Sequence, residues 1–226
     1  MKKKISKYLL LFCMMCVLLF AFGCGKTASE PTAKTTIVQT AEEESEEPIE
    51  EAAQETQEKD IYQTEPVPEG KPQPVEPQKT EVGEEALHCT ISISCATLLE
   101  NQDLLDSAKL GLIPSDGWVL QPMEVTFYEG ENVFHVLQRA CKQQKIHLEF
   151  MDMPLYNSAY IEGIHNLYEF DAGDLSGWMY KVNDWFPNYG CSRYQLEDDD
   201  VIEWVYTCDL GNDVGGGYSA RNGATK

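Results

Sequence analysis

The segment SGWMYKVNDWFPNYGCSRYQLEDDDVIEWVY, residues 176–206, decides the fold, because it carries three of the four tryptophans of the 226-residue chain. Trp178, Tyr180 and Val182 alternate with other side chains, a period of two that is typical of a strand with one buried face. Residues 198–200 are three aspartates and predict a polar turn, and the β-branched and aromatic residues 201–206 favour a second strand. The segment therefore predicts a small domain rich in β-structure, with Trp178 and Trp204 on inward faces.

The residues upstream of this segment predict four more strands and one helix. Alternation and turn signals place strands at residues 89–95, 123–128, 146–150 and 159–167. Between the second and third, apolar side chains recur at i, i+3, i+4 and i+7 along residues 133–144, which predicts an amphipathic helix that lies on a sheet. Asn132 is a favourable N-cap for this helix. His135 lies beside the apolar stripe, so we expect a structural role for it.

Residues 1–23 have the pattern of an export signal. Four lysines within the first seven residues precede a long apolar run, which Ala21-Phe22-Gly23-Cys24 closes. This tetrapeptide resembles the bacterial lipobox, in which the cysteine is lipidated and becomes the mature N-terminus, although Ala21 and Phe22 depart from the usual residues. The sequence predicts an extracytoplasmic protein, anchored to the cell membrane through lipid on Cys24. An uncleaved anchor helix and a soluble secreted product are the alternatives.

Residues 24–85 differ sharply in composition from the rest of the chain. From residue 25 they contain 17 acidic and 5 basic residues, seven prolines and a single aromatic residue, Tyr62. Such a segment buries too little apolar surface to offset its chain entropy, and its like charges and prolines extend it. We expect a disordered stalk, with an acidic binding tail as the alternative. Residues 86–214 would then form the folded domain, and residues 215–226 a flexible tail.

The charge of the chain excludes two kinds of partner. The formal net charge is -21 at pH 7, and residues 86–226 contain 21 acidic against 8 basic residues. Nucleic acid requires a basic surface, and so does electrostatic docking on anionic lipid. We therefore expect no nucleic-acid partner, and a membrane contact that comes through the N-terminal lipid.

Five cysteines follow the lipidation site, and an exported domain favours disulfides. Cys141 lies on the buried stripe of the predicted helix, so we expect it to be a free thiol. The other four cysteines could pair in three ways. If the first and last strands lie side by side and parallel, Cys95 comes near Cys208, which leaves Cys89 to pair with Cys191.

The sequence offers no clear catalytic or metal-binding set. It has no G-x-S-x-G elbow, and the part of the chain that follows Cys24 has no C-x-x-C pair. The acidic side chains between residues 162 and 174 could form a glycosidase pair, but acidic residues are so frequent that such pairs arise by chance. The aspartates of residues 198–200 and 209–213 fail the spacing of a helix–loop–helix calcium site. We expect a protein that is not an enzyme and holds no metal or cofactor.

Three motifs together resemble the transcobalamin-like C-terminal domain family, whose bacterial members were long known as a domain of unknown function. They are GWMYKVN at residues 177–183, FPNYG at 186–190 and DDDVIEWVY at 198–206; the run EGENVFHVLQRA at 129–140 matches the family's turn and helix. The resemblance implies an α+β fold, a small β-grasp-like domain with one helix packed on a mixed sheet. In the vitamin carriers this domain covers one face of cobalamin and a helical domain holds the other. We expect no such helical domain here, so half of that site would be absent.

The resemblance also implies a ligand-facing edge, which by motif would consist of Trp178, Tyr180, Asn183, Trp185, Phe186, Asn188 and Tyr189. Trp185, Phe186 and Tyr189 lie in a loop with Pro, Asn and Gly, so we expect them to be exposed and to serve recognition. The alternative for Trp178 and Tyr180 is the inner face of a strand, and for Asn183 a turn. We expect a binding module for a corrinoid such as cobalamin, a glycan or a surface protein. A structural or adhesive cell-surface domain without a small ligand is the alternative.

Overall fold

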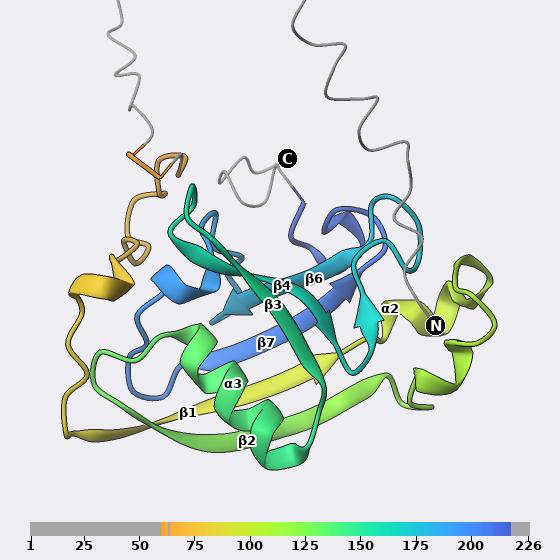
Figure 1. The fold of residues 1–226 in the computed structure, drawn as a ribbon, viewed down its shortest axis with the longest axis horizontal. Helices are drawn as coiled ribbons and strands as arrows, with labels where there is room; N and C mark the ends of the chain where they lie inside the picture. Colours follow the sequence, from red (N-terminus) through yellow and green to blue (C-terminus); the bar gives the residue numbers. More distant parts are fainter. Residues whose placement is uncertain (1–59, 63, 218–226) are drawn as a thin grey trace, which may run out of the picture. The chain divides into compact units, whose positions relative to one another are not determined.

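The computed structural model describes residues 60–62 and 64–217, which form two sheets and one long helix (Figure 1). The larger sheet has the strand order β2-β1-β7-β6 and contains β1 (Ala86–Ser94), β2 (Trp118–Tyr128), β6 (Gly177–Val182) and β7 (Val201–Thr207). The smaller sheet has the order β3-β4-β5 and contains β3 (Leu148–Met153), β4 (Ser158–Ile164) and β5 (Leu167–Tyr168). The helices are α2 (Thr97–Glu100) and α3 (Val133–Gln144), with short 3-10 turns η1 (Pro77–Lys79), η2 (Gln102–Leu104), η3 (Leu110–Leu112), η4 (Cys191–Arg193) and η5 (Asn212–Val214).

The larger sheet is mixed, as the family resemblance implies. β1 runs parallel to β7, with Thr90 opposite Val201 and Ser94 opposite Val205, whereas β1–β2 and β6–β7 are antiparallel pairs. The α+β class is therefore confirmed. The strands predicted at residues 146–150 and 159–167, however, lie outside this sheet. They correspond to β3, β4 and β5, which pair with one another in the smaller sheet. The expectation of a single sheet was therefore wrong, and the finer β-grasp assignment stays a prediction.

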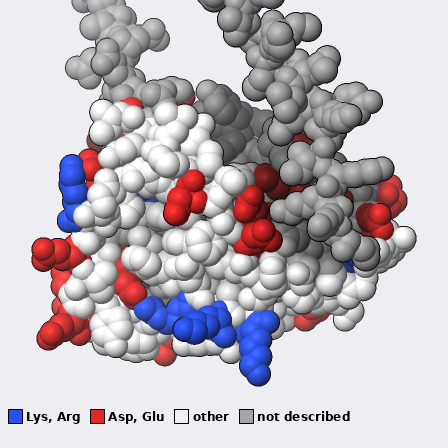
Figure 2. Space-filling model, in the orientation of Figure 1, with Lys and Arg blue, Asp and Glu red and all other residues white. Residues whose placement is uncertain are grey.

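Helix α3 begins and ends where the sequence predicts. Asn132 Oδ1 accepts a hydrogen bond from the His135 N–H (3.1 Å), and His135 Nδ1 accepts one from the Asn132 N–H (3.3 Å), which makes a capping box. The helix ends at Gln144, and the next residue, Lys145, is the C-cap with a left-handed backbone (φ 57°). Figure 2 shows Lys and Arg side chains gathered over the region of α3 on this face. Lys142 belongs to the last turn of the helix, where its charge suits the helix dipole. The structural role of His135 is confirmed.

The core lies between the two sheets and α3. Its largest fully buried side chains include Trp204 and Ile202 of β7, and Phe127 of β2. A second cluster packs beneath the connection between β1 and β2, around Leu98 and Tyr206. Trp204 is therefore a core residue, as its place in the strand pattern predicts.

The packed part of the chain begins upstream of residue 86. Residues 60–62 and 64–79, here called the strap, contact the loop after β6 and η4 (Figure 1), although the sequence assigns them to the disordered stalk. Buried Arg193 supplies the reason, because its guanidinium pairs with Asp60 and its Nε donates to the Val75 carbonyl. Residues 1–59, which hold the predicted signal, Cys24 and the rest of the stalk, lie outside the described residues. Within the described part, the helices are too short and too polar to cross a bilayer.

Candidate functional site

A tight turn after β6 directs Trp185 inward. Asn183 and Asp184 both have positive φ (49° and 60°), as the two central residues of a type I′ hairpin turn require. The N–H groups of Val182 and Trp185 each donate to the carbonyl of the other residue (2.9 and 3.0 Å), so the chain reverses and Trp185 enters the core. The expectation that Trp185 is exposed was therefore wrong.

The other two aromatic side chains of this loop are buried as well. Phe186 is 6% exposed and Tyr189 is 7% exposed. The Phe186 ring lies so close to Gly216 that a Cβ there would come within 2.8 Å of it, and Tyr189 stacks on Tyr194 with 6.1 Å between ring centroids. The expected exposure was wrong for both, because flanking segments cover the loop. Their role in ligand binding stays a prediction.

The polar members of the predicted set have internal partners. The Tyr180 hydroxyl donates to the Tyr189 carbonyl (2.8 Å). Asn183 Nδ2 donates to Asp200 Oδ1 (2.7 Å), while Asn183 Oδ1 accepts from the Val201 N–H (2.9 Å), which ties the end of β6 to the turn before β7. Burial raises the pKa of Asp200. Asn183 thus serves the turn, and Tyr180 lies on the inner face of its strand.

Trp178 is the member of the predicted set that lines a cavity. A hollow of about 310 Å³, here called the edge pocket, opens beside β6, the outer strand of the larger sheet. The Trp178 ring is held in place because its Nε1–H donates to the Leu167 carbonyl (2.8 Å) and its face meets Tyr206 edge-on at 5.2 Å. The rest of the pocket wall comes from Tyr160 of β4, the loop of residues 169–177, Met179, Thr207 and Leu210.

The rim of the edge pocket is apolar and exposed. Phe170 is 60% exposed, Leu210 57% and Leu175 47%. Phe170 and Leu210 both have positive φ (65° and 46°), which is strained for bulky side chains. Backbone hydrogen bonds hold these conformations: the Phe170 N–H donates to the Ser176 carbonyl and the Leu210 N–H to the Leu175 carbonyl. The sequence analysis did not select these three residues. The feature that could have identified them is the presence of large apolar side chains within loops rich in Asp and Gly.

Two carboxylates give the edge pocket a polar side. Glu169 accepts a hydrogen bond from the Tyr160 hydroxyl, and Asp174 lines the opposite part of the loop. Burial and the Glu169 carboxylate both raise the pKa of Tyr160, so its hydroxyl remains protonated. The pocket can therefore offer flat apolar contact together with acceptors for N–H or O–H groups.

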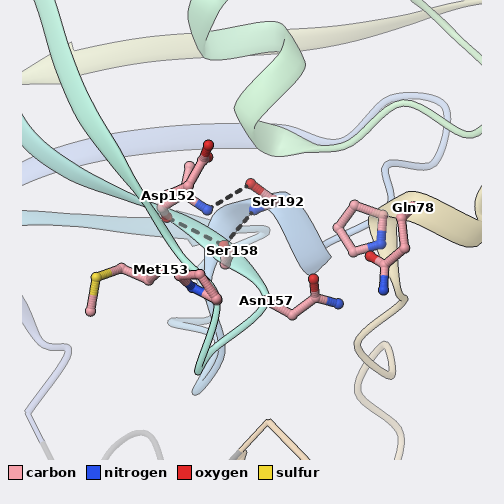
Figure 3. A pocket seen from close by; sticks show the side chains of 9 residues that line it. Gln78, Asp152, Met153, Asn157, Ser158 and Ser192 are labelled. Atoms are coloured by element: carbon pink, nitrogen blue, oxygen red, sulfur yellow. Dashed lines mark hydrogen bonds between the residues drawn. The ribbon is translucent and has the colours of Figure 1, made fainter.

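A second cavity, of about 350 Å³, lies between η1 of the strap and the β3–β4 hairpin (Figure 3). Two serines of its wall are bonded internally: the Ser192 N–H donates to Ser158 Oγ (3.1 Å), and Ser192 Oγ accepts from the Ala159 N–H (3.0 Å). Asn157 Nδ2, in contrast, is buried without a hydrogen-bond partner. Figure 3 shows Gln78 on the side away from these serines. This cavity holds no aromatic ring, so the edge pocket is the better candidate for a ligand site.

The predicted disulfides are absent: the five described cysteines are free thiols. The Cys89 Sγ faces the Val125 carbonyl on β2, whereas the Cys191 Sγ faces the Ala159 carbonyl on β4, so these two point to different strands. Cys95 is buried in the second core cluster, and Cys208 packs at its margin. Burial raises the pKa of Cys95 to about 11 and that of Cys89 to about 12. Cys141 is free and buried, as expected.

The acidic clusters noted in the sequence serve local structure. Asp198 Oδ1 accepts from the His88 N–H, and Asp200 Oδ2 accepts from the Glu197 N–H. Asp171 pairs with Lys109 of the β1–β2 connection. Among the described residues no three His, Cys, Asp or Glu side chains converge as metal ligands would.

Residues 130–208 match the model of a family described as a domain of unknown function, DUF4430. This segment runs from the turn before α3 to the residue after β7. It contains the three motifs between residues 177 and 206 and all but the first residue of the run at 129–140. The match therefore supports that resemblance at the coarse level of a domain type.

Several solved structures are similar to the chain, including the two that follow. Haptocorrin in complex with Cbi aligns at 14% identity with a TM-score of 0.42, over 57% of this chain; the chain spans about a quarter of haptocorrin (26%). A candidate metal-binding protein from Ruminococcus gnavus ATCC 29149 aligns at 11% identity with a TM-score of 0.33, over 54% of this chain and 96% of that one. A search of curated proteins finds no match.

Proposed function

We propose that this protein is a non-catalytic binding module that takes a flat ligand in the edge pocket. The observation that carries the proposal is the ring of exposed apolar side chains, Phe170, Leu175 and Leu210, around a concave site floored by Trp178. Solvent-exposed apolar groups that surround a pocket are typical of binding sites, because a ligand removes them from water. The strained backbone at Phe170 and Leu210 is consistent with a functional position.

The polar groups of the pocket narrow the ligand class. Glu169 and Asp174 are acceptors, so a suitable ligand presents N–H or O–H donors beside an apolar face. Corrinoids carry carboxamide donors around a flat ring, and the faces of sugars carry hydroxyl donors. The volume of about 310 Å³ is at the lower end for small-molecule sites, so a corrinoid would insert one edge and leave the remainder outside. We take a cobalamin-like corrinoid as the first candidate and a glycan as the second.

The proposal places the domain outside the cytoplasm, anchored to the membrane through lipid on Cys24. The basic and apolar pattern of residues 1–23 and the Ala21–Cys24 tetrapeptide support this part. Cells that express the Cys24→Ser chain should lose it from the membrane fraction. A membrane signal that persists in this variant would favour an anchor helix instead of a lipid.

The test of the binding proposal is a titration of the soluble chain of residues 25–226 with cobinamide and cobalamin, followed by tryptophan fluorescence. We expect saturable quenching. Leu210→Ala should weaken binding about tenfold, because it removes apolar groups worth about 1.4 kcal/mol of burial against the ligand. Leu155→Ala is the matched control: Leu155 is 59% exposed, close to the 57% of Leu210, but it does not line the edge pocket.

Two results would count against the edge pocket as a binding site, and a third would change only the ligand class. Equal affinities of the Leu210→Ala and Leu155→Ala chains for the corrinoid would show that the ligand binds outside the edge pocket. A flat titration with both corrinoids, followed by saturable binding of a glycan, would change the ligand class but keep the pocket. A folded chain that binds neither would leave the structural or adhesive surface domain as the better interpretation.

A further inference from the structure

The strap lies on a groove formed by four side chains of one short stretch of chain: Trp185, Asn188, Tyr189 and Arg193. The strap consists of two extended legs, joined by a turn in which the Lys71 N–H donates to the Pro68 carbonyl (3.1 Å). Figure 1 shows the strap, coloured orange to yellow, running down the side of the domain. The Lys71 ammonium lies over the Trp185 ring, 5.4 Å from its centroid.

The groove contacts the main chain of the strap. On the first leg, Asn188 Nδ2 donates to the carbonyls of Glu65 (3.0 Å) and Pro66 (3.1 Å). On the second leg, the Tyr189 hydroxyl donates to the Pro72 carbonyl (2.7 Å), and Arg193 Nε donates to the Val75 carbonyl (3.1 Å). All four acceptors are backbone carbonyls. The groove therefore recognises an extended backbone more than a particular side chain.

Proline fits this mode of recognition. Each leg contains a Pro-x-Pro pair, at residues 66–68 and 72–74. Proline-rich chains are extended before they bind and leave their carbonyls without internal partners, so aromatic grooves with hydrogen-bond donors bind them at a low cost in ordering entropy. Tyr189 and Trp185 supply the rings of such a groove, and Asn188 and Arg193 the additional donors.

Arg193 adds a preference for acidic residues. Its side chain is 3% exposed, and its Nη2 lies 2.7 Å from Asp60 Oδ2. Its Nη1 donates to Thr64 Oγ1 (2.5 Å), and its guanidinium lies over the Tyr62 ring at 4.9 Å. Burial opposes ionisation of Asp60, but the bonds to Arg193 and to backbone N–H groups outweigh it and hold the pKa of that carboxyl below its usual value. A carboxylate upstream of the first Pro-x-Pro pair is therefore part of what the groove accepts.

We propose that this groove is a recognition site for extended, acidic, proline-rich peptide segments, and that the strap occupies it as a ligand within the same chain. The strap is not a perfect occupant, because Asn188 Oδ1 is buried without a hydrogen-bond partner. A peptide from another chain that places an N–H at this point makes one more hydrogen bond than the strap does. Such a peptide competes against a tethered strap, whose effective concentration is about millimolar.

The experiment weakens the strap in the full chain and leaves the groove unchanged. Serine replaces Pro66, Pro68, Pro72 and Pro74, which raises the entropy of the free strap. The probe is a fluorescein-labelled peptide of residues 60–79, followed by fluorescence anisotropy. We expect this open variant to bind the peptide at least tenfold more tightly than the wild-type chain does. Adding Arg193→Met should remove at least tenfold of that affinity, whereas adding Lys109→Met, whose ion pair with Asp171 lies outside the groove, should leave it unchanged.

Each other outcome overturns the proposal. A folded open variant that does not bind the peptide would show that the groove does not recognise this chemistry. If the wild-type chain bound the peptide as tightly as the open variant, and Arg193→Met did not change the affinity, the peptide would bind outside the groove. An open variant that fails to fold would make the strap part of the core. Amide hydrogen exchange of the wild-type chain is an independent test. The Val75 N–H, which donates to the Arg193 carbonyl, should exchange faster than the Ile202 N–H of β7. Equal protection of the two amides would refute a strap that separates from the domain.

Discussion

The capping box of α3 makes the stability of this domain depend on the charge of one histidine. His135 Nδ1 accepts the Asn132 N–H, so the imidazole must be neutral at that nitrogen. Burial lowers the pKa of His135; the Glu131 carboxylate opposes this shift, and the Arg139 guanidinium adds to it. The folded chain therefore binds this proton less readily than the unfolded chain does.

The sign of the pH effect follows from that shift. Above the unfolded pKa of about 6.5 both states are neutral at this position, so the histidine contributes no pH dependence. As the pH falls below that value, the unfolded chain takes up a proton first and the folded state loses stability, until the pH passes the folded pKa. Protonation leaves the buried Asn132 N–H without its acceptor, a loss of about 1–3 kcal/mol.

His135→Gln separates the cap from its charge. The Gln amide oxygen can accept the same N–H and does not titrate, so the variant should match the wild-type chain at pH 7.5 and exceed its stability by about 1 kcal/mol at pH 5. For a domain of this size, that difference is about 2–4 °C in melting temperature. Asn132→Ala should lose about 1 kcal/mol at both pH values, and Asn132→Ser should recover most of it. Parallel pH profiles of the wild-type and His135→Gln chains would refute the reasoning.

Two further perturbations test the backbone and the cysteines. Gly130→Ala should lower the free energy of unfolding in urea by several kcal/mol, because φ is +83° and the new Cβ would lie 2.2 Å from the Glu81 carbonyl oxygen. Gly70→Ala, at φ +76° with open space around it, should lower it by only about 1–2 kcal/mol, through backbone strain alone. Equal losses in the two variants would contradict the clash at Gly130. In the chain of residues 25–226 without reductant, Cys208 should react with a thiol reagent in the native state and four more thiols only after unfolding; fewer than five in total would show a disulfide.

Local sequence patterns predicted the helix and the approximate positions of most strands. Helix α3 follows from its apolar period and from Asn132, and alternation of side chains located β1, β3, β6 and β7 to within a few residues. It missed the start of β2 at Trp118, and it joined β4 and β5 into one predicted strand of residues 159–167, because the turn at His165 and Asn166 was not recognised. The parallel β1–β7 pair was considered only as a condition for one cysteine pairing; the structure contains this pair of strands but not the disulfides. The separate smaller sheet was missed, because alternation locates a strand but does not name its partner.

The candidate site was harder to predict, for two physical reasons. The direction of Trp185 depends on the backbone of Asn183 and Asp184, whose positive φ values reverse the chain; an Asn-Asp pair between two apolar residues is a signal that a hairpin turn was available. The strap has the composition of a disordered segment, and its contacts use backbone carbonyls that every residue possesses. Amino-acid composition therefore does not reveal that the strap packs on the domain.

The strap is also the part of the described chain that should open first. None of its described residues belongs to a strand, and Val67 is the one apolar side chain among them that packs against the core cluster, so little apolar burial opposes the entropy gained on release. Release would uncover Asn188, Tyr189 and Arg193, because strap atoms are partners of all three. Trp185 would stay in place, since its direction is set by the turn after β6 and by its contacts with Tyr189 and Tyr194. An opened domain would thus present a preformed groove of one amide, one phenol and one guanidinium beside a fixed aromatic wall, without the unfolding of either sheet.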